Sequence, residues 1–399
     1  MKVAIFHTEF AYSGGAERMT FEQIDYLKKK GHKVVCFTAF VDRAECFPDG
    51  IKKYDIRQIL PEFLNKIVPH DLMIVATTLA FPLFLFSFRN YNIFLGENHV
   101  APWWAFMASL VSRKPYITYH NYPLSITYPR QIDKTARRNR LIVDLLVRIA
   151  NPIIVFIDKL VVKSADLSFA DGKHAKDVCK KAYGKNFVDC PGGAAPGEFN
   201  KKILNRRYSG NITVAKKVIK KPYILITNRH FPAKKLELGI EVFSKLTQQN
   251  SEISLVITGA PTTYTEGLRR LTKELNLEKR VVFPGLVIGS ELSKLYQNTL
   301  VYIYTAPEED FGLGILEAMA HGVPQVVWDS AGPKYLVKNN IVGFKIPLGG
   351  LDEFAKKVGR LIDDEGLNFS MATASFKHSK KYSWENHGKI LEGALRKYE

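Results

Sequence analysis

The stretch that decides the fold is residues 307–337, which read PEEDFGLGILEAMAHGVPQVVWDSAGPKYLV. The preceding residues 300–305 (LVYIYT) form a short apolar run rich in β-branched and aromatic side chains, which predicts a buried strand. After the glycines, apolar residues recur at helical spacing over 315–320, and Gly322-Val323-Pro324 predicts the end of that helix. The pattern therefore predicts a strand, a glycine-bearing turn and a helix.

Two carboxylates, Glu309 and Glu317, lie on either side of this turn. Gly312 and Gly314 let backbone N–H groups approach a ligand at the positive end of the helix, which suits an anion such as phosphate. Carboxylates in turn are good acceptors for the hydroxyls of a sugar. The combination predicts a nucleotide sugar as ligand, and the alternative is a pair of solvated glutamates on an ordinary strand–loop–helix unit.

The segment resembles the E-x7-E motif of the retaining glycosyltransferases of family four. The resemblance implies an α/β fold of the GT-B type, in which two Rossmann-like domains with parallel sheets face each other across a cleft. It also implies a C-terminal helix that crosses back to the first domain. Glu309 would contact the hydroxyls of the transferred sugar and Glu317 the ribose, with Gly312, Leu313 and Gly314 also at the donor.

The first strand and helix carry a second sign of this family. Residues 2–7 (KVAIFH) predict a strand, 16–30 a helix and 33–40 a further strand. The loop between them lacks GxGxxG, so the sequence does not support a nicotinamide cofactor. Instead Gly14-Gly15 begins a segment that resembles the family's GGAER loop, which implies that these glycines face the diphosphate and the sugar.

A histidine, His120, ends the predicted strand 117–120 (ITYH). The carboxyl ends of parallel strands are where ligand crevices form in open α/β sheets. The resemblance implies that His120 hydrogen-bonds the sugar near the reacting centre. The alternatives are a packed histidine and a rival, His99, in another loop.

A cationic loop follows the first strand of the second half, residues 223–227 (YILIT). Arg offers a planar fork of donors and Lys a point charge, and both suit a pyrophosphate. Arg229 and Lys234 have the spacing of the family's GR-x4-KG pattern. Asn228 and Lys235 replace its two glycines, which leaves open whether Lys234 or Lys235 faces the diphosphate, and a basic surface loop is the alternative.

The nucleobase is expected against the segment that ends at Val287, where the family uses mainly backbone groups. The resemblance implies an N-terminal Rossmann-like domain, residues 1–205, that binds the acceptor of the sugar. A C-terminal Rossmann-like domain, residues 206–380, would bind the nucleotide sugar, and residues 381–399 would form the crossover helix. Residues 201–221, rich in Lys and Arg with little apolar periodicity, are predicted to be the interdomain link.

The 399 residues carry a formal net charge of +18, which suits a polyanionic partner or an anionic membrane face, and in part a diphosphate donor. No zinc-finger spacing or RNA-recognition signature is found, so nucleic acid is not a predicted partner. Residues 130–140 are basic and follow the aromatic segment 103–106, which suits a peripheral enzyme on an anionic bilayer. A solvated helix face is the alternative.

The four cysteines form no CxxC pair, which predicts reduced thiols in a cytoplasmic protein. Residues 72–88 carry no charge but are short for a membrane span and contain Pro82. They are predicted to form a buried strand at 72–78 (LMIVATT) and then an apolar helix. Charges within 141–162 argue against a span there too, and the protein is predicted to be soluble or peripheral.

These features together predict a retaining glycosyltransferase that moves a hexose, mannose among the candidates, from a GDP- or UDP-linked sugar. The acceptor would be a hydroxyl of a lipid-linked or polysaccharide glycan. No metal or other cofactor is expected, because Arg229, Lys234 and the amides of Gly14, Gly15 and Gly314 would stabilise the departing diphosphate. The alternatives are a catalytically silent nucleotide-sugar-binding subunit and a GT-B nucleotide-sugar epimerase.

Overall fold

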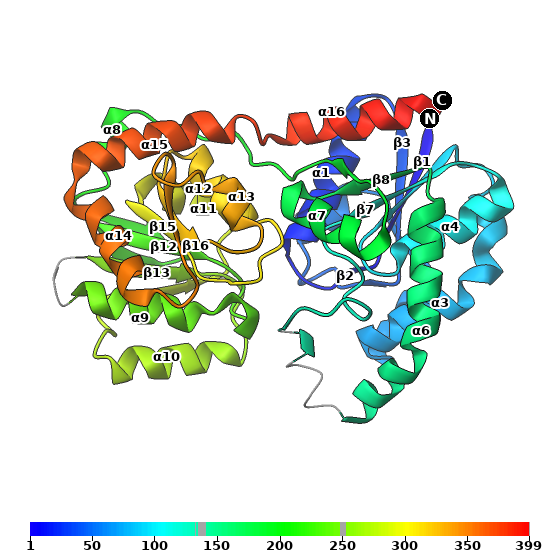
Figure 1. The fold of residues 1–399 in the computed structure, drawn as a ribbon, viewed down its shortest axis with the longest axis horizontal. Coiled ribbons are helices and arrows are strands. Elements are labelled where there is room, and N and C mark those ends of the chain that lie inside the picture. Colours follow the sequence, from blue (N-terminus) through cyan, green and yellow to red (C-terminus); the bar gives the residue numbers. More distant parts are fainter. Residues whose placement is uncertain (132, 135–140, 248–252, 399) are drawn as a thin grey trace. The chain divides into compact units, whose positions relative to one another are not determined.

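The computed structural model describes the chain except residues 132, 135–140, 248–252 and 399 (Figure 1). Most of the predicted basic segment 130–140 therefore lies outside the described residues. The chain divides into two compact units: Met1–Gly192 with Trp384–Glu399, called unit 1, and Gly193–Ser383, called unit 2. The sequence-based domain limits were 205/206 and 380/381.

Unit 1 is built on a parallel sheet whose strands pair in the order β5-β3-β1-β6-β7-β8-β9. The inner strands are almost continuously apolar and buried, as parallel strands covered on both faces are. The strands are β1 (Lys2–His7), β3 (Lys33–Thr38), β5 (Ile56–Gln58), β6 (Ile93–Glu97), β7 (Tyr116–His120), β8 (Leu167–Ala170) and β9 (Val188–Asp189), beside a separate pair of β2 (Glu9–Phe10) and β4 (Phe40–Val41).

Helices cover both faces of this sheet. They are α1 (Gly15–Lys29), α2 (Pro48–Lys53), η1 (Glu62–Lys66), α3 (His70–Ala80), η2 (Phe81–Phe88), α4 (Ala101–Ser112), α6 (Leu141–Ser164), α7 (Gly172–Tyr183), α16 (Trp384–Leu395) and η4 (Arg396–Tyr398). Helix α16 comes after the whole of unit 2, yet it packs on α1, where a Cβ at Gly388 would overlap the ring of Tyr26. This confirms the predicted C-terminal helix that returns to the first half.

Unit 2 has a second parallel sheet, with the order β14-β13-β12-β15-β16-β17. Its strands are β12 (Tyr223–Thr227), β13 (Ser254–Thr258), β14 (Val281–Gly285), β15 (Val301–Tyr304), β16 (Gln325–Trp328) and β17 (Gly343–Ile346). The helices are α8 (Lys201–Asn205), η3 (Pro232–Lys234), α9 (Leu236–Thr247), α10 (Tyr264–Glu274), α11 (Gly289–Asn298), α12 (Leu313–Ala320), α13 (Pro333–Leu336), α14 (Leu351–Asp363) and α15 (Glu365–Ser379).

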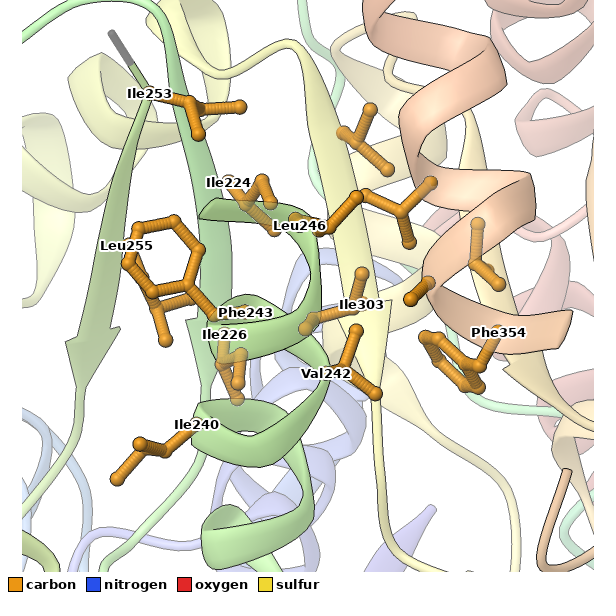
Figure 2. Close-up of a cluster of buried hydrophobic side chains, with 14 of the residues drawn as sticks. Ile224, Ile226, Ile240, Val242, Phe243, Leu246, Ile253, Leu255, Ile303 and Phe354 are labelled. Carbon is orange, nitrogen blue, oxygen red and sulfur yellow. The ribbon is translucent and has the colours of Figure 1, made fainter. Parts of the chain in front are cut away.

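Figure 2 shows the core between this sheet and its helices. Ile240 and Phe243 of α9 point toward the strands that carry Ile226 and Leu255, and Phe354 comes from α14. The apolar residues of α9 recur at three- and four-residue spacing, so one face of the helix covers the sheet. Both units are thus α/β layers around a parallel sheet, and the predicted fold class is confirmed.

Two predictions were wrong. Residues 201–221 are not a link but part of unit 2, where β10 (Asn211–Val214) and β11 (Lys217–Lys220) form an antiparallel hairpin. The fully buried Arg207 donates to the carbonyl oxygens of Gly322 (2.8 Å) and His321 (2.6 Å). The segment is rich in Lys and Arg, which predicts an exposed linker, but Arg207 is buried in unit 2.

Residues 72–78, predicted to be a buried strand, are instead helical and belong to α3, which continues into η2. Met73, Thr77 and Phe81 recur every four residues and are buried, so the segment touches the core along one helical face only. The aromatic segment 103–106 likewise lies in a helix, α4. An apolar run of this length does not distinguish strand from helix by composition alone.

Candidate functional site

Glu309 lies in the loop after β15 and makes an ion pair with Lys234. The Nζ of Lys234 is 2.6 Å from Oε2 of Glu309, and the hydroxyl of Tyr304 donates to the same oxygen. Thr305 also donates to the carbonyl oxygen of Lys234 at 3.0 Å, which ties the two loops together. Burial, and then the charge of Glu309, raise the pKa of Tyr304 well above its usual value, so the phenol stays protonated. Two donors therefore hold the Glu309 carboxylate in place.

The structure distinguishes the two lysines that the sequence left open. Lys235 has a left-handed backbone (φ 49°), and its Nζ lies 3.4 Å from Glu237 rather than near Glu309. It occupies the position of the second glycine in the family pattern, where a left-handed residue is expected. Lys234 is therefore the lysine that reaches the Glu309 loop.

The loop after β12 also carries Asn228 and Arg229. The Tyr304 hydroxyl, whose hydrogen goes to Glu309, also lies 3.3 Å from Oδ1 of Asn228, while the buried Nδ2 of Asn228 has no hydrogen-bond partner among the described residues. The guanidinium of Arg229 lies 5.8 Å from the centre of the Phe231 ring. A buried amide donor without a partner is uncommon in proteins, and here it lies beside the Glu309 cluster.

Glu317, on the second turn of α12, is also held by a tyrosine. The hydroxyl of Tyr296 donates to Oε2 of Glu317 at 2.8 Å and is itself 2.8 Å from Oγ1 of Thr227. The same Thr227 oxygen lies 2.8 Å from the hydroxyl of Tyr302. Burial, and then Glu317, raise the pKa of Tyr296. A chain of hydroxyls thus connects the start of the site loop to the second carboxylate.

The glycines at the start of α12 are required by backbone geometry and packing. Gly312, the N-cap, has φ 102°, which favours glycine. A Cβ at Gly314 would clash with the hydroxyl of Tyr302 and lie 2.9 Å from Oγ1 of Thr227. Leu313 is half-buried at the first position of the helix, and the first N–H groups of α12 are available to an anion.

Val287 has its side chain in the apolar core of unit 2. It lies between β14 and α11, where Gly285 and Gly289 both have positive φ. Its neighbours Leu286 and Ile288 are exposed, so a ligand at this loop would meet their side chains as well as the main chain. That a nucleobase binds here stays a prediction.

In unit 1, the carboxyl ends of neighbouring strands bring polar residues together. His7 of β1 is paired in register with Glu97 of β6, and Nδ1 of His7 lies 3.3 Å from Oε2 of Glu97. Thr20 of α1 donates to the same oxygen at 2.5 Å. Burial lowers the pKa of His7, but the hydrogen bond and charge of Glu97 outweigh it, and the net shift is upward. The other carboxylate oxygen of Glu97 is buried with no partner among the described residues.

His120 ends β7 and is fully enclosed. Burial, and then Lys185 and His99, lower its pKa to about 3, so the ring is neutral at physiological pH. Its Nε2 has no hydrogen-bond partner among the residues the structure describes. The rival His99 is exposed, with a left-handed backbone (φ 42°).

Gly14 and Gly15 open helix α1 in the same unit. A Cβ at Gly14 would displace the carboxylate end of the Glu17 side chain and lie 3.0 Å from the Tyr12 ring, so the turn leaves little room there. His120, Gly14 and Gly15 thus lie in unit 1 and the other predicted site residues in unit 2. Their convergence on one ligand stays a prediction.

Sequence reasoning missed Tyr296 and Tyr304, which hold the unit 2 carboxylates, and Tyr302, whose hydroxyl bonds to Thr227. A signal was available: Tyr302 and Tyr304 are two residues apart in VYIY, so they share one face of the strand that leads to Glu309. It also missed His7 and Glu97, each the last residue of a strand.

The two α/β units match the fold of solved GT-B structures. The structure of Anabaena HepE in complex with UDP and glucose superimposes with a TM-score of 0.75, at 16% identity, over 100% of both chains. The profile of the family "Glycosyl transferases group 1" matches residues 211–378. Residues 211–378 are therefore similar to the group 1 glycosyltransferases, within a chain that has the GT-B fold.

Curated relatives agree. An uncharacterized glycosyltransferase of Methanocaldococcus jannaschii is 32% identical over 167 residues, which are 42% of this chain and 42% of that protein. The alpha-1,3/1,6-mannosyltransferase ALG2 of Dictyostelium discoideum is 22% identical over 395 residues, 91% of this chain and 90% of that protein. The first similarity thus spans less than half of the relative, whereas the second spans nearly all of it at low identity.

Proposed function

We propose that this protein transfers a hexose, with retention at the anomeric carbon, from a GDP- or UDP-linked sugar to an acceptor hydroxyl. Mannose is the first candidate, since one relative is named a mannosyltransferase, and the HepE complex with UDP and glucose supports a nucleotide-sugar donor. The acceptor is a lipid-linked or polysaccharide glycan, and the protein acts without a metal, as a cytoplasmic or peripheral enzyme.

The observation that carries the proposal is the pair of Lys234 and Glu309, joined at 2.6 Å. In a donor complex, Glu309 would accept from hydroxyls of the transferred sugar, while Lys234 and Arg229 would lie at the diphosphate. Positive charge aimed at the departing diphosphate stabilises the charge that develops as the glycosidic bond breaks. The ion pair keeps both groups in place before the donor arrives.

The remaining residues take supporting roles. Glu317, held by Tyr296, would accept from the ribose hydroxyls, and the main chain around Val287 would meet the base. The amides of Gly14, Gly15 and Gly312–Gly314 would bind phosphate oxygens. His120 would hydrogen-bond the sugar through Nε2, the nitrogen that has no partner among the described residues.

A thermal-shift panel of UDP, GDP and ADP tests the donor. A nucleotide present at about 100 times its Kd stabilises the folded protein by about 2.7 kcal/mol, so the matching base should raise the melting temperature. Only one of the three is expected to do so strongly. If none does, the nucleotide-sugar assignment is wrong.

Product analysis with the matching donor then separates the alternatives. Sugar transferred to an acceptor with retained anomeric configuration supports the proposal. Nucleotide binding without any turnover, for every donor of that base, supports a silent subunit. A donor converted into its epimer in the absence of acceptor supports an epimerase.

A further inference from the structure

One helical segment of unit 1 exposes its apolar side chains in a regular pattern. Residues 70–88 are long and apolar enough to cross a membrane by length and composition, and only 22% of this window is buried. The outward side chains are Leu72, Val75, Leu79, Leu83 and Phe86, with Leu79 77% and Leu83 81% exposed. Their spacing of three and four residues makes a continuous stripe along the solvent side of the helix.

Helix α6 carries a second stripe of the same kind. Ile149, Ile153, Phe156 and Leu160 are all exposed, with Ile153 at 65% and Phe156 at 68%. Again the spacing is that of one helical face. Single exposed apolar residues are normal on a protein surface, but two ordered stripes are not.

The two stripes belong to one layer of helices, because α4 is hydrogen-bonded to both α3 and α6. Trp104 of α4 donates to Oγ1 of Thr78 at 3.2 Å, and Trp103 donates to Oδ1 of Asp158 of α6 at 3.0 Å. Residues of η2, α4 and α6 share one apolar cluster on the same face of the sheet. Figure 1 shows α3, α4 and α6 on this part of unit 1.

The segment 70–88 is held on the unit by its other face. Met73, Phe81 and Phe88 are buried, and the Phe81 ring stacks on Trp104 with centroids 5.9 Å apart. Crossing a bilayer would remove these contacts from the core. The geometry therefore suits a helix that lies in the interface with one face in lipid and the other on the protein.

The charges around the stripes favour an anionic surface. Cations lie in or next to these helices at Lys66, Arg89, Arg113, Lys114, Lys159 and Lys163, whereas the exposed acids of the same segments, among the described side chains, are Glu62, Asp71 and Asp166. Glu62 is already paired with Arg43, and Asp71 lies 3.0 Å from His70. The guanidinium of Arg89 lies 4.3 Å from the centre of the Phe86 ring, so a cation lies directly beside an exposed apolar side chain of the stripe.

We propose that this helical layer docks unit 1 on an anionic lipid bilayer, with the two stripes inserted among the acyl chains and the surrounding cations at the headgroups. A second copy of the chain fits less well, because two identical cationic rims would repel each other across a symmetric interface. The inference rests on the proposed function only in that a lipid-linked acceptor would be presented at the same surface.

Sedimentation of the full-length protein with vesicles tests the docking. We expect binding to vesicles of phosphatidylcholine with phosphatidylglycerol, and weaker binding to phosphatidylcholine alone. The double variants L79S/L83S and I153S/F156S should each lose at least about tenfold in vesicle partitioning, since burying one such side chain is worth that or more. Each of the changes Lys66→Gln and Arg89→Gln should lower partitioning onto the anionic vesicles about fivefold.

The matched control is I341S/L348S, which alters two apolar side chains of unit 2 that are each 56% exposed. This variant should bind vesicles as the unaltered protein does. Equal binding by the stripe variants, or no binding by the unaltered protein, would overturn the proposal. So would a dimer in light scattering that the stripe variants abolish without any effect of lipid. The nucleotide thermal shift, measured on the same variants, reports the donor site separately, so each hypothesis can fail alone.

Discussion

The two units treat the polar groups of their candidate sites differently. In unit 2 the carboxylates already have partners, because Lys234 and Tyr304 hold Glu309 and Tyr296 holds Glu317. In unit 1 the strand ends leave Nε2 of His120 and Oε1 of Glu97 buried with no partner among the described residues. An unpartnered buried polar atom costs roughly 1–3 kcal/mol. The carboxylates of unit 2 are therefore held in advance, and Nδ2 of Asn228 is the atom of that cluster left without a partner among the described residues. In unit 1 a carboxylate oxygen itself is left without one.

The largest effect that sharpens this comparison should come from the ion pair of unit 2. Glu309→Gln and Lys234→Met should each slow sugar transfer by about 10²–10³-fold, because each removes a charge placed at the reacting centre. The measurement is the initial transfer rate with the matching donor at saturating acceptor.

Lys235→Met is the matched control for that experiment. It removes a neighbouring lysine that pairs with Glu237 instead of Glu309. Near-normal transfer by this variant, beside the loss in Lys234→Met, would show that the site lysine is the one the structure brings to the carboxylate. Transfer unchanged in all three variants would refute the assignment of the pair.

A smaller effect is expected on the stability of unit 1 when the pH is lowered. Burial lowers the pKa of His387 on α16 to about 4, below the usual 6.5. Below pH 6.5 the unfolded chain takes up a proton that the folded unit does not, so stability is complete above this pH and is lost as pH falls toward about 4. The loss is roughly 3 kcal/mol for this residue.

Hydrogen exchange of α16 at pH 7 and at pH 4 measures that loss. His387→Gln cannot titrate, so its protection should fall less on acidification than that of the unaltered protein. The same loss of protection in both proteins would show that His387 does not carry the effect.

The smallest effect concerns the hydroxyls that hold Glu317. Tyr296→Phe keeps the ring in the core but removes the donor 2.8 Å from the carboxylate, so Glu317 is no longer fixed. Affinity for the nucleoside diphosphate should fall about tenfold, as expected for one hydrogen bond to a charged group. Titration calorimetry measures the change.

Tyr223→Phe provides the comparison for this variant. Tyr223 is as buried as Tyr296, and its hydroxyl donates to the carbonyl oxygen of Leu295 in α11 at 2.6 Å. It should lower the melting temperature without changing the nucleotide Kd. Equal affinity loss in both variants would mean that the effect is general destabilisation of unit 2.

The features predicted correctly from the sequence are those that depend on local patterns of residues. The fold class followed from strand–turn–helix units, and Glu309 with Lys234 followed from two loops that resemble a family motif. Tyr296 and Tyr302 were missed, because a tyrosine in an apolar strand or helix gives no sign of where its hydroxyl points. Their partners come from other elements, and such contacts depend on the tertiary fold.

The errors had a common physical origin. Residues 72–78 were predicted to be buried because they are apolar, but burial follows from what covers a helix face, and nothing in the described chain covers this one. Residues 201–221 were predicted to be a link because they are charged, but Arg207 is buried with backbone carbonyls as its partners. Composition alone does not give the partner of a side chain.

The return of α16 to unit 1 has a consequence for synthesis on the ribosome. Unit 2 is one uninterrupted piece of chain, so it can fold as soon as residue 383 has emerged. Unit 1 begins first but lacks the helix that covers Tyr26 until α16 is made. Nascent domains usually fold in order from the N-terminus. Here the first unit cannot be completed until unit 2 has been made, so the face of α1 that α16 covers stays open to chaperones during the synthesis of unit 2.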